Sequence, residues 1–253
     1  MQKHLATLIV CGLMTGAASQ ASAQSTQWTD RGYFGLNFAV ESGSTDLNGG
    51  RTYTLYDEQA RLDTTGKGEA GPLFDLSAGA RVWGNFSVGI GFQTMSSKSD
   101  ASVTGAIPHP LFYNRARNIS ETVPSLKRNE HAVHLQFGYT FPINEKLDVM
   151  VYGGPSFFRI SQDVISDVTV GERGAPFDSV IAQPSVTRLK ESPVGGHIGA
   201  DVTYKLTTFN KVGLGVGGFL RYAGASTTFR VLDTDVDSNV GGMQFGVGLR
   251  ARF

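Results

Sequence analysis

Side chains that could carry out hydrolysis flank one polar stretch of the chain. Ser96 and Ser97 precede it, and Glu130 and His131 follow it. A serine, a histidine and a carboxylate are the groups that an acyl hydrolase uses as nucleophile, general base and orienting acid. No motif here fixes their mutual geometry. We therefore expect a protein that is not an enzyme, and keep a lipid-modifying enzyme as the last alternative.

A second candidate is an acidic run near the end of the chain. Asp233, Asp235, Asp237 and Asn239 place oxygen ligands at every second position, loosely as in a calcium-binding loop. The run lacks the central glycine and the distal glutamate that such a loop needs. No phosphate-binding loop, cofactor fingerprint or metal-ligand spacing occurs elsewhere. The sequence thus predicts a solvated acidic loop, no metal site and no cofactor.

The elements that must position all these groups are segments in which apolar residues alternate with polar or small ones. In the last segment, Met243, Phe245 and Val247 alternate with Gln244 and with glycines. Because successive side chains of a strand point to opposite faces, each segment has one apolar and one polar or bare face. Eight segments show this pattern, at residues 31–41, 73–83, 86–93, 133–141, 147–160, 194–206, 211–222 and 240–253.

The fifth segment is less regular than the others. Met150 and Tyr152 compete with Val149 and Val151 for the apolar face, so its facing stays open. Pro155 has no backbone N–H to donate and indicates a bulge or an edge-like irregularity.

Long and short connections alternate strictly between these segments. Long polar stretches at 42–72, 97–129, 161–193 and 223–239 follow the odd-numbered strands, and short turns, such as Gly84-Asn85, follow the even-numbered ones. This rhythm predicts an all-β fold: an eight-stranded antiparallel up-and-down transmembrane β-barrel with short periplasmic turns and four long extracellular loops. A soluble barrel with reversed faces is the alternative. The few charges and many glycines of the polar faces, and long loops on one side only, argue against it.

The polar faces would line the barrel interior, which eight strands leave just wide enough for side chains. Opposite charges buried there must pair, because a lone buried charge is costly. We therefore expect a plug of salt bridges, and as an alternative a constriction that selects anions. The charged or titratable residues expected in this lumen are Asp75, Arg81, His134, Asp148, Asp201, Lys205, Lys211, Arg221, Arg250 and Arg252.

The first residues have the pattern of a secretory signal peptide. Lys3 precedes an apolar run, and Ala21-Ser22-Ala23 is a cleavage motif before Gln24, which predicts a mature barrel domain of residues 24–253. The one cysteine, Cys11, lies in the removed part.

With 22 basic and 22 acidic residues in the whole chain, loss of Lys3 leaves a net charge near −1. No basic field favours nucleic acid. Arg115, Arg117, Lys127 and Arg128 nevertheless give the second long stretch a basic character that would suit lipopolysaccharide phosphates.

The signal peptide, the strand rhythm, the Gly-x-Gly runs and the terminal Phe253 together resemble the small bacterial outer-membrane β-barrels of the OmpA, OmpX and OmpW type. The resemblance implies a cell outer-membrane location in a Gram-negative bacterium, with Phe253 as a signal for the barrel-assembly machinery. It also implies outer-membrane lipids and lipopolysaccharide as partners, and we expect a monomer. Envelope structure or surface interaction through the long outer loops is the expected function. A narrow porin-like channel for small or apolar solutes is the alternative.

Overall fold

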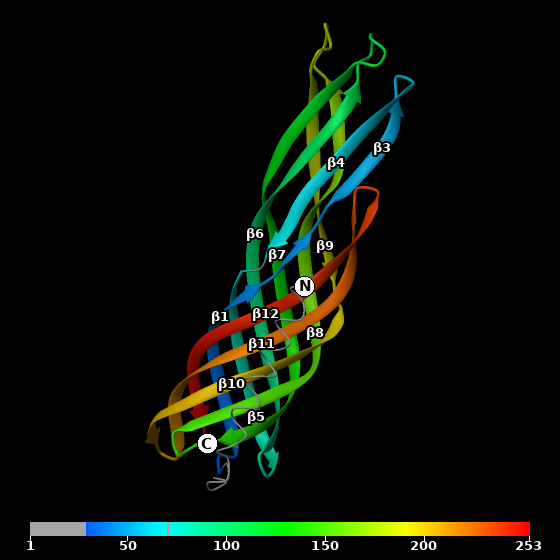
Figure 1. The fold of residues 1–253 in the computed structure, drawn as a ribbon. Coiled ribbons are helices and arrows are strands. Elements are labelled where there is room, and N and C mark those ends of the chain that lie inside the picture. The colour runs from blue at the N-terminus through cyan, green and yellow to red at the C-terminus, as the bar shows by residue number, and fades with distance from the viewer. Residues whose placement is uncertain (1–28, 70) are drawn as a thin grey trace, which may run out of the picture.

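The chain folds into antiparallel strands that follow one another around a barrel, shown as a ribbon in Figure 1. This computed structural model describes residues 29–69 and 71–253. The expected signal peptide, with its cleavage site at Ala23 and Gln24, lies outside the described residues. No helix in the described part of the chain is long and apolar enough to cross a membrane.

Within residues 29–69 and 71–253, twelve strands are present where the sequence led us to expect eight. They are β1 (Gly32–Ser42), β2 (Ser44–Asp46), β3 (Gly49–Leu55), β4 (Glu58–Glu69), β5 (Pro72–Trp83), β6 (Phe86–Pro108), β7 (Ala116–Pro142), β8 (Leu147–Glu172), β9 (Val180–Glu191), β10 (Val194–Phe209), β11 (Val212–Val231) and β12 (Thr234–Arg252).

Pairing closes part of this sheet into a ring. Strand β1 pairs with β12, and the ladder continues through β11, β10, β8, β7, β6 and β5 back to β1. Every ladder in the ring is antiparallel, and closure leaves no free sheet edge there. We call this part the ring.

The remaining strand length forms a second part, which we call the extension (residues 43–69, 97–127, 161–191 and 225–239). Strands β2 and β3 pair with β4, β4 pairs with the far half of β6, and β9 pairs with the far half of β8. Figure 1 shows these hairpins projecting from one end of the ring, opposite the C-terminus. The expectation of four long loops was therefore wrong: these stretches are hairpins. At about 3.3 Å per residue, the 27 residues of β7 extend about 90 Å.

The faces of the strands exchange polarity between ring and extension. In the ring half of β7, Leu135 and Phe137 are exposed while His134 and Gln136 are buried. In the extension half of the same strand Ile119 is buried. The ring is thus polar inside and apolar outside, and the extension has an apolar interior.

Bulges lie near this change. One extra residue enters β7 opposite Ser99 to Ala101 of β6, and Ser125 there has a φ of 60°. Another enters β8 between Ile165 and Asp167. A bulge bends its strand and changes which residues face inward, so these two strands can present apolar residues to the interior of the extension after they leave the ring.

The interior of the extension is a continuous apolar core contributed by all its hairpins. Its buried members are Ala60, Leu62, Ala101, Val103, Ile107, Ile119, Leu126, Ile165, Val168, Ala182 and Leu232. Because these residues come from segments far apart in the sequence, their packing binds the hairpins into one body.

The facing of the fifth expected strand is settled in β8. Met150 and Tyr152 are buried inside the ring, and Val151 is exposed outside it. Pro155 pairs with Gly196 of β10 without a register shift, whereas the β7–β8 ladder has no pairs between Phe137↔Gly153 and His134↔Ser156. The irregularity at Pro155 is thus an interruption of one ladder and not a bulge.

Candidate functional site

The ring interior holds stacked layers of ion pairs. Nearest the C-terminus, Arg252 donates from Nη2 to Asp148 Oδ1 at 2.7 Å and to Thr203 Oγ1 at 2.9 Å. Its guanidinium also lies 5.4 Å from the centre of the Tyr33 ring. Because β12, β8, β10 and β1 all place these positions on their inward faces, the layer joins four strands.

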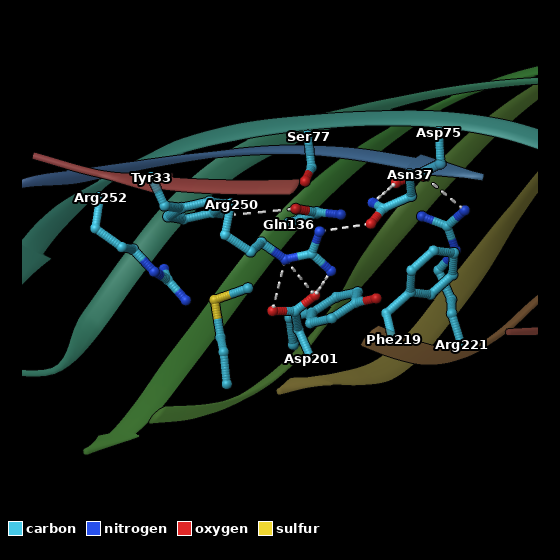
Figure 2. Close-up of a pocket in the computed structure, with 12 residues that line it drawn as sticks. Tyr33, Asn37, Asp75, Ser77, Gln136, Asp201, Phe219, Arg221, Arg250 and Arg252 are labelled. Atoms are coloured by element: carbon cyan, nitrogen blue, oxygen red, sulfur yellow. Dashed lines mark hydrogen bonds and ion pairs between the residues drawn. The ribbon is translucent and has the colours of Figure 1, made fainter. Parts of the chain in front are cut away.

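The next layer is centred on Arg250 (Figure 2). Its Nε donates to both Asp201 oxygens at 3.1 Å, and its Nη2 also pairs with Asp201. Its Nη1 donates to Asn37 Oδ1 at 2.5 Å, and Asn37 in turn donates to Asp75 at 2.8 Å. A buried guanidinium needs such a set of acceptors to offset its desolvation.

The third layer is centred on Arg221. Its Nη2 lies 2.9 Å from Asp75 Oδ2, while its Nε donates to Gln244 at 2.7 Å and its Nη2 to Gln93 at 2.7 Å. From Gln93 a chain of polar contacts continues through His134 at 3.0 Å. It then runs through Ser156, which lies 2.8 Å from His134 and 2.9 Å from His197.

Glycine makes this crowding possible. A Cβ on Gly89 would lie 2.3 Å from the Tyr33 hydroxyl, and one on Gly217 would lie 2.9 Å from Arg250 Nε. A space among the Arg221, Arg250 and Arg252 layers has a volume of about 10 Å³. This is roughly the volume one water centre requires. The lumen of the described chain is therefore filled by its own side chains.

Most residues expected in the lumen lie there. Asp75, His134, Asp148, Asp201, Arg221, Arg250 and Arg252 are buried, and Arg81 is half-buried. Lys205 lies at the mouth, 4.0 Å from Asp30. Lys211 was predicted wrongly: it is exposed, with a φ of 70°, in the turn between β10 and β11. A two-residue turn at Asn210-Lys211 takes Lys211 out of the alternation.

The expected list omitted several partners of these charges. All three of the following side chains face inward. Asn37 bonds to both Arg250 and Asp75, Tyr33 donates to Gln136 at 3.3 Å, and Ser156 lies between His134 and His197. Their positions in the alternating pattern indicate their facing, but a search for charged groups passes over neutral ones. Glu41 and Glu130 also face inward and are buried.

The hydrolase candidates do not come together. Glu130 is buried in the interior, whereas His131 is exposed and stacks on Phe92 with ring centres 6.4 Å apart. Neighbouring residues of a strand face opposite sides, so this histidine and this carboxylate cannot share a site. Ser96 bonds to Asn129 at 2.8 Å, and Ser97 donates to the carbonyl of Glu69 at 2.5 Å.

The acidic run at the end of the chain lies in β12 and the turn before it. Asp233 pairs with Arg51 at 2.8 Å, Asp235 lies 3.8 Å from Arg230, and Asp237 accepts from Thr228 at 2.9 Å. The expected solvated loop is thus mostly a paired strand. Within the described residues, no group of three or more histidine, cysteine, aspartate or glutamate side chains gathers in a way that could hold a metal ion.

Ion pairs also tie the hairpins of the extension together. Arg117 of β7 bonds through both terminal nitrogens to Glu172 of β8, and through Nη2 to the carbonyl of Pro108 at 2.6 Å. The hydrogen bonds from Arg117 hold the pKa of Glu172 below its usual value. Arg117 and Arg128 are buried, so the basic character expected for this stretch reaches the surface mainly through Arg115 and Lys127.

We expect Asp201→Ala to destabilise the ring strongly. Removal of the carboxylate leaves Arg250 charged and buried, which typically lowers the free energy of unfolding by about 3–5 kcal/mol. Urea unfolding of protein refolded into phospholipid vesicles measures the change. The matched control is Asp63→Ala, which breaks an exposed pair with Arg61 and should cost less than about 1 kcal/mol. Equal losses in both variants would show that the lumen pairs are not desolvated.

We expect acid to loosen the tie between Arg117 and Glu172. The carboxylate has a lowered pKa in the folded protein, so its stabilising contribution is complete above its unfolded pKa of about 4.5. This contribution is lost as pH falls through the lower folded-state value. Spin labels on Leu111→Cys and Ser179→Cys, in a chain that begins at Gln24, report the separation of the two hairpin tips.

The distance distribution should be narrow at pH 7 and broaden below pH 4, in the range where carboxylates take up protons. In the Glu172→Gln control it should be broad already at pH 7 and respond less to acid. The remaining groups near this carboxylate are Tyr56 and His109, which stay unchanged in the control. A wild-type distribution that is the same at both pH values would refute the role of this ion pair.

Comparison with known proteins gives likeness of fold only. No protein-family model matches the chain, and no curated protein sequence matches it. Among solved structures, Ail of Yersinia pestis with a heparin analogue is 14% identical, covering 88% of this chain and 99% of that one, with a TM-score of 0.36. The outer-membrane protease OmpT of Escherichia coli is 11% identical over 92% and 100%, with a TM-score of 0.45. The outer-membrane protein AlkL in lipid bilayers is 12% identical over 92% and 93%, with a TM-score of 0.35.

These likenesses do not single out the OmpA, OmpX or OmpW type. The exposed and buried side chains of the ring indicate its surroundings. A closed ring whose outer side chains are apolar and whose buried interior is charged matches a lipid surround and not water. The described residues thus form a closed antiparallel β-barrel with an apolar exterior and a charged interior.

Proposed function

We propose that this protein is a non-enzymatic outer-membrane barrel that acts at the cell surface through its extension, above a lumen closed by its own ion pairs. The observation that carries the proposal is the continuity of the long strands. Strands β6, β7 and β8 each belong to both the ring and the extension without a break, and each contributes residues to the apolar core of the extension. The extension is therefore held rigidly and cannot move as separate loops.

The proposed span is the ring. Its exposed apolar residues include Phe38, Ile90, Phe137, Val202, Leu220 and Val247. On β7 they extend from Val133 to Phe141, about 30 Å of strand, which a tilted strand projects onto a band of about 25 Å. Outer-membrane barrels keep short turns in the periplasm. This favours an orientation with the turns at Gly84-Asn85 and Asn210-Lys211 inside and the extension outside.

The filled lumen supports surface action over conduction. A solute would have to displace the layers centred on Arg221, Arg250 and Arg252, each of which is bonded to a carboxylate. The ring closes with its own strands, which favours a monomer. Contact with outer-membrane lipids and lipopolysaccharide, and assembly through Phe253, remain predictions from the resemblance.

The surface that the proposal assigns to interaction is the far end of the extension. Leu111, Phe112 and Tyr113 are exposed at the tip of the β6–β7 hairpin. Arg115 lies 5.2 Å from the centre of the Phe112 ring and bonds to Asp178 of the neighbouring hairpin at 3.1 Å. Aromatic and arginine side chains of this kind are enriched in protein interfaces.

We expect the refolded protein to be electrically silent in a planar lipid bilayer. The ion pairs close the path for solutes, and the energy to separate one buried pair is about 3–5 kcal/mol. Insertion is checked in the same sample by resistance of the ring to protease. Regular stepwise conductance from inserted wild-type protein would contradict the closed lumen and establish the channel alternative.

We expect Val247→Lys to lower the free energy of unfolding in a bilayer by about 2–4 kcal/mol, because it places a charge near the midplane of the hydrocarbon. Val247 is 70% exposed on the outside of the ring. The control is Val186→Lys on β9 of the extension, where Val186 is 45% exposed. A substitution on a water-facing surface should change stability by less than about 0.5 kcal/mol. A neutral effect at position 247 would mean that the ring does not span the membrane.

A further inference from the structure

A polar pocket lies where the ring passes into the extension. The ladder between β1 and β12 ends at Ser42↔Met243, after which the chain continues as β2, which pairs with β4 and not with β12. Thr45 Oγ1 donates across this gap to the carbonyl of Asn239 at 2.9 Å. The space has a volume of about 190 Å³, and we call it the rim pocket. Its lining comprises Glu41, Gly43, Ser44, Thr45, Gly68, Arg128, Asn239 and Gly241.

Arg128 lines the rim pocket and has donors without a partner. The residue is 4% exposed, and its Nη2 lies 3.2 Å from Glu130 Oε2. Its Nε and Nη1 are buried and have no hydrogen-bond partner. A buried donor without a partner costs about 1–3 kcal/mol, and more when it is charged. Such a group in a polar space indicates an occupant that accepts hydrogen bonds.

Gly68 lies against this guanidinium. A Cβ on Gly68 of β4 would lie 2.8 Å from Arg128 Nη1. A larger residue at position 68 would therefore displace the guanidinium and reduce the space beside it.

Glu41 supplies the opposite charge on the pocket lining. It is 7% exposed, and its Oε2 accepts from Gln244 Nε2 at 2.7 Å. Among the described residues, the ion pair of Arg128 is with Glu130, and Glu41 and Arg128 form no ion pair with each other. Glu130 is fully buried and does not line the pocket. The lining of the rim pocket thus carries one cationic and one anionic side chain that form no ion pair with each other.

From this arrangement we infer that the rim pocket binds a small zwitterion, with its acid group on Arg128 and its ammonium group on Glu41. Charge-assisted hydrogen bonds of both kinds would form without adding net charge to a buried site. An anion alone would meet Arg128 but would also face the carboxylate of Glu41. The hydroxyls of Ser44 and Thr45 add neutral hydrogen-bonding groups on the same lining.

The acid group of the zwitterion can be a carboxylate or a phosphate, and the experiment separates these sources. Isothermal titration of the refolded full mature chain uses β-alanine and O-phosphoethanolamine as probes. Ethanolamine and inorganic phosphate serve as probes that carry charge of one sign only. We expect at least one zwitterion to bind at least tenfold more tightly than either single-charge probe. Equal binding of phosphate alone, or no binding of either zwitterion, would overturn the proposal.

Variants locate the binding. Arg128→Gln and Gly68→Val should each weaken the zwitterion at least tenfold, the first by removing the charge and the second by filling the space beside it. Arg61→Gln is the matched control, because Arg61 pairs with Asp63 on the surface of the same strand as Gly68. It should bind as the wild type does. If Arg128→Gln does not fold, Gly68→Val and Thr45→Val carry the test, and unchanged affinity in both would place the binding elsewhere.

Discussion

The structure depends on one constraint: the same strands must be stable against two different surroundings. A strand of a single-layered barrel buries only one of its faces. The buried face has to be apolar where the exterior is water, and polar where the exterior is lipid, as we propose for the ring. Strand β7 meets this by burying His134 and Gln136 in the ring and Ile119 in the extension. The change is made along a continuous backbone, and bulges beside Ser125 and Ile165 adjust the facing there. Rigidity of the extension follows, because its core begins where the ring's ion pairs end.

Burying charges inside the ring costs desolvation energy, and the ion pairs that offset this cost also fix the register of the ring strands. A slip of one residue in any ring strand would turn its inward charges into the lipid. Arg250 reaches Asp201 and Asn37 only when β12, β10 and β1 are in the observed register. Glycines at positions such as Gly89 and Gly217 supply the space these long side chains need. The glycine content and the charged lumen are therefore two consequences of one requirement, a narrow interior filled without loose volume.

Much of the ring could be predicted from alternation alone, since facing in a regular strand follows from a period of two. The charged partners Asp148, Asp201 and Arg252 were found in this way. The extension could not be predicted from alternation. Its apolar residues are spaced irregularly because bulges shift the period, and Pro124 and Pro184 within β7 and β9 suggest loops. Lys211 was misplaced for a related reason, because a turn residue does not follow the pattern of the strand beside it.

The rim pocket lies where the polar interior of the ring meets the apolar interior of the extension, which explains why its lining holds buried charged side chains. The rim pocket lies between the ion-pair layers of the ring and the apolar core of the extension. Here the ladder between β1 and β12 has ended, and β2 pairs with β4. Arg128 lies on the inward face of β7 with the lumen charges, yet two of its nitrogens have no partner. An apolar residue here would have sealed the junction without a buried charge. A buried guanidinium with two unpartnered nitrogens is costly, and a ligand that bonds to both Arg128 and Glu41 would offset that cost.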